Sequence, residues 1–191
     1  MPENSATGSI TREEIAEAVR SSTLEVFSTM LGMEVSAGEP ITGTAAFSQK
    51  SGIIALLGLA GDWVGSGRLS ADPGFSCKIA SALLMQDYES VNEEVLDAMG
   101  EVGNMIIGNV KTALEARLGT LGLSTPTVVY GLNFEARSVG NRDSVIIPFT
   151  SEHGHLDVQV SIAPKPSDTS GEKHLDLAGK TASGRVDLAY L

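Results

Sequence analysis

Glu101 and Asn104 are the two residues of this sequence whose types and spacing best suit chemistry. A carboxamide donates and accepts hydrogen bonds without carrying a charge, and a carboxylate pairs with a cation such as a lysine ammonium. Each residue of an α-helix turns by about 100°, which places Asn104 roughly 60° from Glu101. Asp97 and Gly108 would lie on the same side, roughly 40° and 20° from Glu101. The spacing therefore predicts one polar helix face able to hold a water molecule and a cationic partner.

The simplest alternative is an ordinary solvated surface, where polar residues are usually found. Spacing alone does not decide, because the chain contains a second Glu-x-x-Asn pair at residues 89–92, where N-terminal helix capping explains it. The glycines around the first pair favour a function, since each of Gly100, Gly103 and Gly108 costs a helix about 1 kcal/mol relative to alanine. Gly108 would let another surface approach the helix backbone. Gly103 would lie towards the buried side, where close packing on a sheet explains it.

Hydrophobic periodicity predicts that a long helix over residues 91–118 carries this polar face. Its apolar stripe lies roughly 140° around the helix from Glu101. The stripe consists of Val91, Val95, Met99, Val102, Ile106, Val110, Leu114 and Leu118. Two further helices are predicted over residues 12–31 and 73–86, each after an N-terminal capping signal. Gly32 is the expected end of the first helix.

Short apolar runs between turn signals predict strands on both sides of the last two helices. The predicted strands cover residues 33–36, 43–49, 52–59, 63–70, 127–134, 144–150 and 156–163. The unbroken apolar run from Ile53 to Leu57 is typical of a strand buried on both faces. The order lacks the regular alternation of a parallel doubly wound sheet. We therefore expect an α+β fold, with a mixed or antiparallel sheet, helices packed on one side and a long central helix carrying the site.

Composition excludes several classes of partner. The 191 residues, 42% of them apolar, suit one globular domain. A net charge of −11 repels phosphate backbones and anionic lipids, so we expect neither nucleic acid nor membrane as a partner. One cysteine and no signal peptide indicate a reducing compartment, the cytoplasm. We expect a flexible leader over residues 1–11, a domain over 12–163 and a C-terminal tail over 164–191.

Other reactive residues carry weaker signals. His153 and His155 could begin a metal site, but no third ligand is evident and an ordinary turn is the simpler explanation. We therefore expect no metal ligand set of its own in this chain. Cys77 is expected to be a small buried hydrophobe. Trp63 could be either a turn-edge contact or an interface residue.

The segment over residues 97–109 resembles the central helix of the CheX-type chemotaxis phosphatases, within the wider CheC/CheX/FliY group. The pattern of that group is an acidic residue or serine, three residues, glutamate, two residues and asparagine, followed by a proline after the helix. Here these positions are Asp97, Glu101, Asn104 and Pro126. The resemblance covers roughly residues 12–163. The chain has one copy of the motif where CheC proteins have two, which favours the CheX branch.

The resemblance implies hydrolysis of the aspartyl phosphate of a CheY-like response regulator. Asn104 would then orient the attacking water, and Glu101 would pair with the regulator's lysine. Asp97 could contact the partner or could equally be an exposed salt-bridge residue, and Gly108 would let the partner approach the helix backbone. The protein would need no cofactor of its own, because the regulator would supply Mg²⁺. The resemblance also implies a homodimer built through the sheet.

The chemistry agrees with this implication, because phosphoryl transfer needs positioning and charge compensation more than covalent work by the protein. Two other classes of function stay open. One is a non-catalytic interaction module that binds a response regulator or a flagellar-switch component. The other is a stand-alone metal hydrolase, which would require bound metal in the purified protein.

Overall fold

The structure is a computed structural model that describes residues 9–43, 47–136 and 144–166, so most of the predicted leader and tail lies outside the described residues.

The first helix ends in an unusual turn. Helix α1, Arg12–Val26, continues directly into a short π-helix, η1, Phe27–Leu31. Gly32 ends it with a φ of 61°, a left-handed conformation that glycine adopts without strain. The first predicted helix is therefore confirmed, with its last turn wound more widely than an α-helix.

The second and third helices follow each other in sequence. Helix α2 is Pro73–Leu84, and helix α3 is Glu93–Leu118. The Asn92 side chain accepts a hydrogen bond from the Val95 N–H at 2.9 Å and so caps α3. Helix α3 therefore begins two residues later than predicted, and capping accounts for the asparagine of the second Glu-x-x-Asn pair. No helix in the described part of the chain is long and apolar enough to cross a membrane.

Eight strands form one sheet within the described residues, and every strand pair in it is antiparallel. The strands are β1 Ser36–Ala37, β2 Ile41–Gly43, β3 Phe47–Gly61, β4 Trp63–Ala71, β5 Leu121–Leu123, β6 Thr127–Ala136, β7 Ser144–Ser151 and β8 Gly154–Pro164. Their order is β1-β7-β8-β4-β3-β5, with β2 also beside β7 and β6 also beside β3. The predicted α+β class and antiparallel sheet are confirmed.

The strand predictions over residues 33–36 and 43–49 are wrong in their bounds. The Met33 N–H donates to the Phe27 carbonyl at 3.0 Å, so it closes the π-helix and does not enter the sheet. Only Ser36 of the first predicted strand pairs with β7. β2 ends at Gly43, and β3 then runs without a break through the Ser51–Gly52 step, because β6 pairs with it on both sides of that step.

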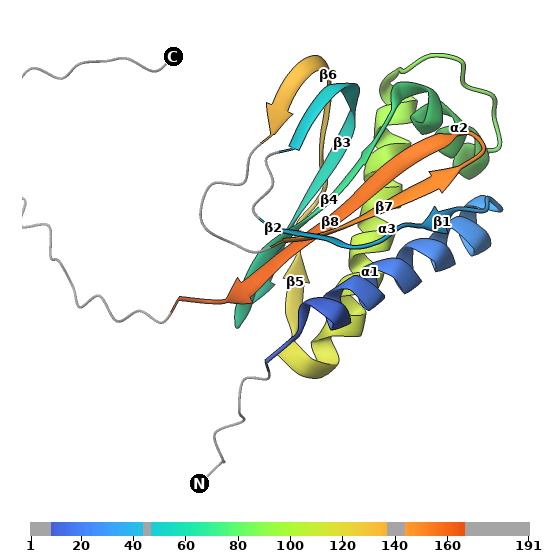
Figure 1. Cartoon of the computed structure of the whole chain (residues 1–191). Helices are drawn as coiled ribbons and strands as arrows, with labels where there is room; N and C mark the ends of the chain where they lie inside the picture. Colours follow the sequence, from blue (N-terminus) through green and yellow to red (C-terminus); the bar gives the residue numbers. More distant parts are fainter. Residues whose placement is uncertain (1–8, 44–46, 137–143, 167–191) are drawn as a thin grey trace, which may run out of the picture.

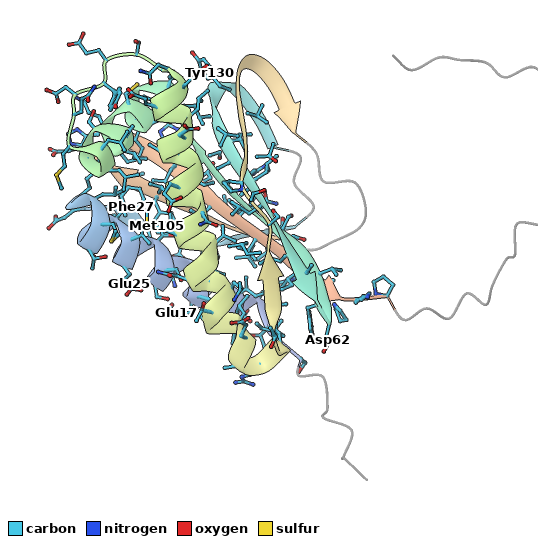
Figure 2. All side chains as sticks on the ribbon, turned by 180° about the vertical axis from the view of Figure 1, so that it is seen from behind. Glu17, Glu25, Phe27, Asp62, Met105 and Tyr130 are labelled. Atoms are coloured by element: carbon cyan, nitrogen blue, oxygen red, sulfur yellow. The ribbon has the colours of Figure 1, made fainter. Side chains whose placement is uncertain are left out.

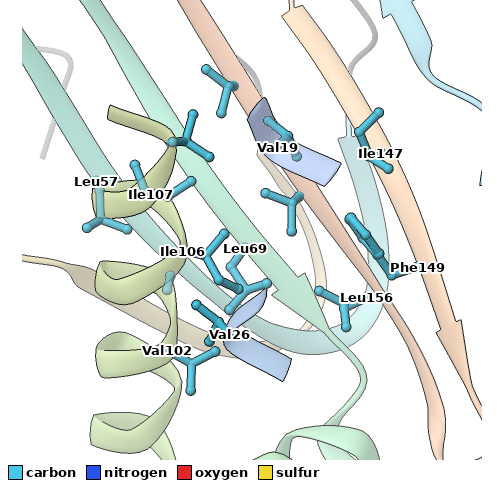
Figure 3. Close-up of a cluster of buried hydrophobic side chains, with 14 of the residues drawn as sticks. Val19, Val26, Leu57, Leu69, Val102, Ile106, Ile107, Ile147, Phe149 and Leu156 are labelled. Atoms are coloured by element: carbon cyan, nitrogen blue, oxygen red, sulfur yellow. The ribbon is translucent and has the colours of Figure 1, made fainter. Parts of the chain in front are cut away.

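All three α-helices pack on one face of the sheet (Figure 1). Alternate residues of β3 face them, and Ile53, Ala55 and Leu57 are buried in the core. Figure 3 shows the centre of that core, where side chains of α1, α3 and the sheet meet. They are Val19 and Val26 of α1, Val102, Ile106 and Ile107 of α3, and Leu57, Leu69, Ile147, Phe149 and Leu156 of the sheet. On the opposite face Ile54 is 1% exposed but Leu56 is 36% exposed. The prediction of burial on both faces therefore holds for Ile54 and fails for Leu56.

Two glycines bring α3 close to the sheet. A Cβ atom on Gly103 would lie 3.0 Å from the Cβ of Ala55, and one on Gly67 of β4 would lie 2.6 Å from Ile107 side-chain atoms. Close packing of Gly103 on the sheet is therefore confirmed. The contact also fixes which side of α3 faces the core and which side faces away from it.

Candidate active site on the long helix

The outward surface of α3 carries all four residues singled out from the sequence. Figure 2 shows α3 in front of the sheet, with α1 on one side of it and β5 and β6 on the other. Asp97 and Glu101 are exposed, and Asn104 and Gly108 are half-buried. Because these residues are four, three and four positions apart, the helix brings them together on the surface turned away from Gly103.

The polar side chains of this surface keep their hydrogen-bonding capacity. Among the described residues, none forms a side-chain hydrogen bond or ion pair with Asp97, Glu101 or Asn104. A carboxylate accepts several hydrogen bonds, and a carboxamide both donates and accepts. The surface can therefore bind a water molecule or a cationic group without first breaking a contact within the described part of the chain.

The last turns of α3 use their polar residues differently. Lys111 Nζ donates to Glu115 Oε1 at 2.8 Å, and the Leu121 N–H donates to the same oxygen at 2.9 Å. The hydrogen bond from Lys111, followed by the one from Leu121, holds the pKa of the Glu115 carboxyl below its ordinary value. This carboxylate ties the end of α3 to the start of β5 and is a structural residue.

A wall from the β5–β6 connection borders the site on one side. A Cβ on Gly100 would lie 3.2 Å from Val128 Cγ2 and 3.5 Å from Pro126 Cγ. A Cβ on Gly108 would meet only Leu123, at 3.8 Å. Pro126, the proline of the sequence motif, is therefore packed directly beside the residue that precedes Glu101.

The other border of the site is formed with α1. Met105 is half-buried on the side of α3 that faces α1, and Glu17 and Glu25 lie on the exposed side of α1 (Figure 2). Arg20 pairs with Glu17 at 3.0 Å and offsets one of these charges. Arg117 of the last turn of α3 pairs with Glu14 of the first turn of α1 at 2.8 Å, so the two helices lie side by side. This border of α3 thus combines the half-buried Met105 with carboxylates of α1, which suits a partner with basic residues.

Comparison with known proteins identifies the family. The family model described as chemotaxis phosphatase CheX matches residues 53–150, just over half of the chain and including all of α3. The chain belongs to the CheX family. The resemblance found from the sequence is confirmed, and so is the predicted enzyme class, because a phosphatase is a hydrolase.

Individual CheX relatives agree with this assignment. The chain is similar to the CheY-P phosphatase CheX of Thermotoga maritima, at 29% identity over 127 residues that cover 66% of this chain and 81% of the relative. It is also similar to the crystal structure of CheX from Desulfovibrio desulfuricans, at 28% identity and a TM-score of 0.71, covering 78% of this chain and 99% of that one. A third similar structure is the CheX–CheY–BeF₃–Mg²⁺ complex from Borrelia burgdorferi, with 28% identity, a TM-score of 0.65 and coverage of 78% and 96%.

The remaining candidates from the sequence do not assemble into a second CheX-type or metal site. His153 lines a polar hollow of about 670 Å³, beside Glu152, whereas His155 Nδ1 lies 3.3 Å from Asp72 Oδ2. Within the described ranges no three His, Cys, Asp or Glu side chains are grouped so that they could hold a metal ion. Cys77 is buried, as expected. Trp63, the first residue of β4 after the turn, is only 6% exposed and belongs to the core, so it is not an exposed interface residue.

The sheet face opposite the helices contains a buried charge that the sequence analysis missed. Arg68 of β4 is 8% exposed, and burial lowers its pKa to about 10 despite the opposing effect of Asp157. Burial also raises the pKa of Asp157, an effect that Arg68 partly offsets. A single arginine inside an apolar strand gives little signal, because its burial depends on neighbouring strands.

Proposed function

We propose that this protein hydrolyses the aspartyl phosphate of a CheY-like response regulator, with Asn104 orienting the attacking water and Glu101 pairing with the regulator's lysine. Two relatives support the substrate class. The Thermotoga maritima relative is a CheY-P phosphatase, and the Borrelia burgdorferi structure is a complex of CheX with CheY, BeF₃ and Mg²⁺.

The observation that carries the proposal is the pairing of an exposed carboxylate and an adjacent carboxamide on one rigid helix, neither of them engaged by the described residues. Hydrolysis of an acyl phosphate needs a water held in line with the leaving oxygen. The Asn104 carboxamide can accept a hydrogen bond from that water and donate another to a phosphoryl oxygen. Because it is neutral, it does not repel the negative charge that develops there.

The remaining residues of this face would hold the regulator. Glu101 would attract the lysine of the regulator's active site, and Asp97, one turn earlier, would add to the negative potential. At Gly108 a Cβ would meet only one side-chain atom, at 3.8 Å, so this part of α3 is open to close approach. The protein would thereby insert its helix into the regulator's pocket and complete a site that neither partner has alone.

Magnesium belongs to the regulator in this proposal. The described residues of α3 offer Asp97, Glu101 and Asn104, which we assign to partner contact and water orientation. Mg²⁺ bound by the regulator would neutralise phosphoryl charge during hydrolysis. The protein needs no metal of its own for this division of labour.

We also propose that two copies associate through the sheet. β6 is the outermost strand beside β3 in the described part of the chain, and an outer strand can pair with a second copy. A reducing cytoplasm suits the acidic chain with its single buried cysteine.

Decay of a phosphorylated CheY-like regulator tests the proposal. The regulator is phosphorylated in excess Mg²⁺, and phosphate release is followed alone and with the wild type, Asn104→Ala, Glu101→Ala or Asn109→Ala. Asn109 is the matched control, because it is an exposed asparagine of the same helix outside the candidate site. We expect acceleration by the wild type and by Asn109→Ala, and its loss in the other two variants.

Other outcomes identify the alternatives. Binding without faster decay would favour a non-catalytic interaction module. Acceleration that survives both Asn104→Ala and Glu101→Ala would show that hydrolysis uses other residues. Phosphatase activity that needs a metal bound to the purified protein itself would favour a stand-alone metal hydrolase.

A further inference from the structure

The connection between β5 and β6 is a bulge in the sheet. Leu59 of β3 pairs with Leu123 at the end of β5, and Leu56 pairs with Thr127 at the start of β6. Between these pairs, two residues of β3 face three residues of the other strand, 124–126. A strand that gains one residue over its partner bends locally, and such bulges are frequent beside active sites. Pro126 fits here because it has no N–H to donate to the ladder.

Ser124 fastens the bulge to β3. Its N–H donates to the Gly58 carbonyl at 2.9 Å, and its Oγ accepts a hydrogen bond from the Gly58 N–H at 2.8 Å. The Ser124 hydroxyl donates to the Thr125 carbonyl at 2.9 Å. The side chain therefore replaces a missing backbone partner of β3 and fixes the direction of the next peptide group.

The bulge runs along the same stripe of α3 that carries Asn104. Gly100, Asn104 and Gly108 follow each other at intervals of four residues, so they lie in a row that is about 12 Å long. One end of the row, Gly100, faces Pro126, and the other end, Gly108, faces Leu123. An extended chain from Leu123 to Pro126 spans about 10 Å, which matches the row. Asn104 is half-buried, and its position midway between Gly100 and Gly108 puts it opposite the middle of the bulge.

We infer that Ser124 is a positioning residue of the α3 site, which holds the bulge as a fixed wall that restricts the carboxamide of Asn104 to the orientation needed for water. This inference rests on the proposed role of Asn104. Gly100 also helps to place this wall, because the absence of a Cβ there lets Pro126 and Val128 pack against α3. Ser124 acts through Asn104 and does not touch the regulator's phosphoryl group.

The inference predicts a separation of turnover from binding. Ser124→Ala should lower kcat for phosphate release about tenfold, because misplacement of a positioning group by a fraction of an ångström slows reaction strongly. KM should change by less than about twofold, since Glu101 and the rest of the exposed docking surface are unaltered. Affinity for a beryllofluoride-loaded regulator should likewise stay close to the wild-type value. Ser124→Thr, which retains the hydroxyl, should restore kcat.

Two further variants control for stability. Ser28→Ala removes a serine hydrogen bond of similar kind, from Ser28 Oγ to the Glu25 carbonyl at 3.1 Å, and should leave kcat unchanged. Gly100→Ala should lower kcat like Ser124→Ala, because its Cβ would lie 3.2 Å from Val128 Cγ2 and displace the wall. Its melting temperature should fall less than that of Gly103→Ala, because alanine favours the helix and the contact at Gly100 is the less close of the two.

The experiment separates failure of this inference from failure of the proposed function. If Asn104→Ala loses turnover but Ser124→Ala keeps the wild-type kcat, the bulge has no positioning role and the proposed function stands. A parallel fall in kcat, affinity and melting temperature for Ser124→Ala, without rescue by Ser124→Thr, would show a structural role only and overturn the inference. If Asn104→Ala keeps full turnover, the proposed function fails and this inference fails with it.

Discussion

Helix α3 presents two polar pairs on its outer surface, and the two differ in how they are used. Glu115 accepts hydrogen bonds from Lys111 and from the Leu121 N–H, so its carboxylate connects the end of α3 to the start of β5. Glu101 and Asn104, about three turns earlier, make no side-chain contact of that kind among the described residues. Along its length, helix α3 therefore separates polar groups that hold the fold together from polar groups that no described residue engages.

Loss of the carboxamide should have the largest effect. Asn104→Ala should lower kcat for regulator dephosphorylation by about 100-fold, the typical effect of removing one group that orients the reacting centre. Its melting temperature should not fall below that of the wild type, because the Asn104 side chain forms no hydrogen bond with the described residues and alanine favours the helix. A variant that is both inactive and less stable would place Asn104 with the fold-holding residues instead.

Loss of the carboxylate should weaken docking. Glu101→Ala should reduce affinity for a beryllofluoride-loaded regulator roughly 30-fold, about 2 kcal/mol, because the regulator's lysine is left without its partner. Titration calorimetry measures the change directly. Unaltered affinity would show that Glu101 does not contact a charged group of the regulator.

Two glycine substitutions test the two sides of α3. Gly103→Ala should lower the free energy of unfolding by about 1–3 kcal/mol, since its Cβ would press on Ala55 at 3.0 Å. Gly108→Ala should raise the free energy of unfolding by up to about 1 kcal/mol, because alanine has a higher helix propensity than glycine and the space around Gly108 is open. Urea unfolding measures both, and Gly108→Ala should still weaken regulator binding. Equal stability changes of one sign would contradict this assignment of sides.

The smallest effect should come from the fold-holding pair. The pKa of Glu115 is lowered in the folded state, so its contacts stabilise the protein above the unfolded pKa of about 4.3 and lose their effect as pH falls through the folded-state value. Glu115→Gln should therefore reduce stability at neutral pH, with the difference from wild type shrinking below about pH 4. Urea unfolding midpoints of both proteins, measured at neutral pH and below about pH 4, show this change in the stability difference. The kcat for regulator dephosphorylation should not change. A difference that grows on acidification would contradict the assigned sign.

Much of the fold and the placement of the candidate residues could be predicted from local sequence. The stripe from Val95 to Leu118 repeats with helical spacing, and this fixes the side of α3 on which Glu101 and Asn104 lie. The strands from Trp63 and from Ser144 onwards alternate or run apolar for long enough to be recognised. These features depend on neighbours along the chain, which a single sequence contains.

The features that were missed depend on distant partners. β5 has only three residues, and it is a strand because it pairs with the end of β3 and is tied to Glu115. Gly67 gives no periodic signal, yet Ile107 of α3 packs directly on it. The bulge at Ser124 exists only relative to the register of β3. Pairing between distant segments gives little signal in the sequence of a short segment. For that reason β5, the packing at Gly67 and the bulge at Ser124 are seen only in the structure.

The placement of Glu101 and Asn104 on one uninterrupted helix has a consequence for how the protein can change over time. The backbone hydrogen bonds inside α3 set the distance between these two residues, so substitutions in the surrounding loops and helices do not change it. The flanking surfaces, with Met105 and the exposed carboxylates of α1 on one side, can then vary without disturbing that distance. Mutations at the borders would then change which regulator is recognised, while the proposed catalytic pair, Glu101 and Asn104, would be inherited unchanged.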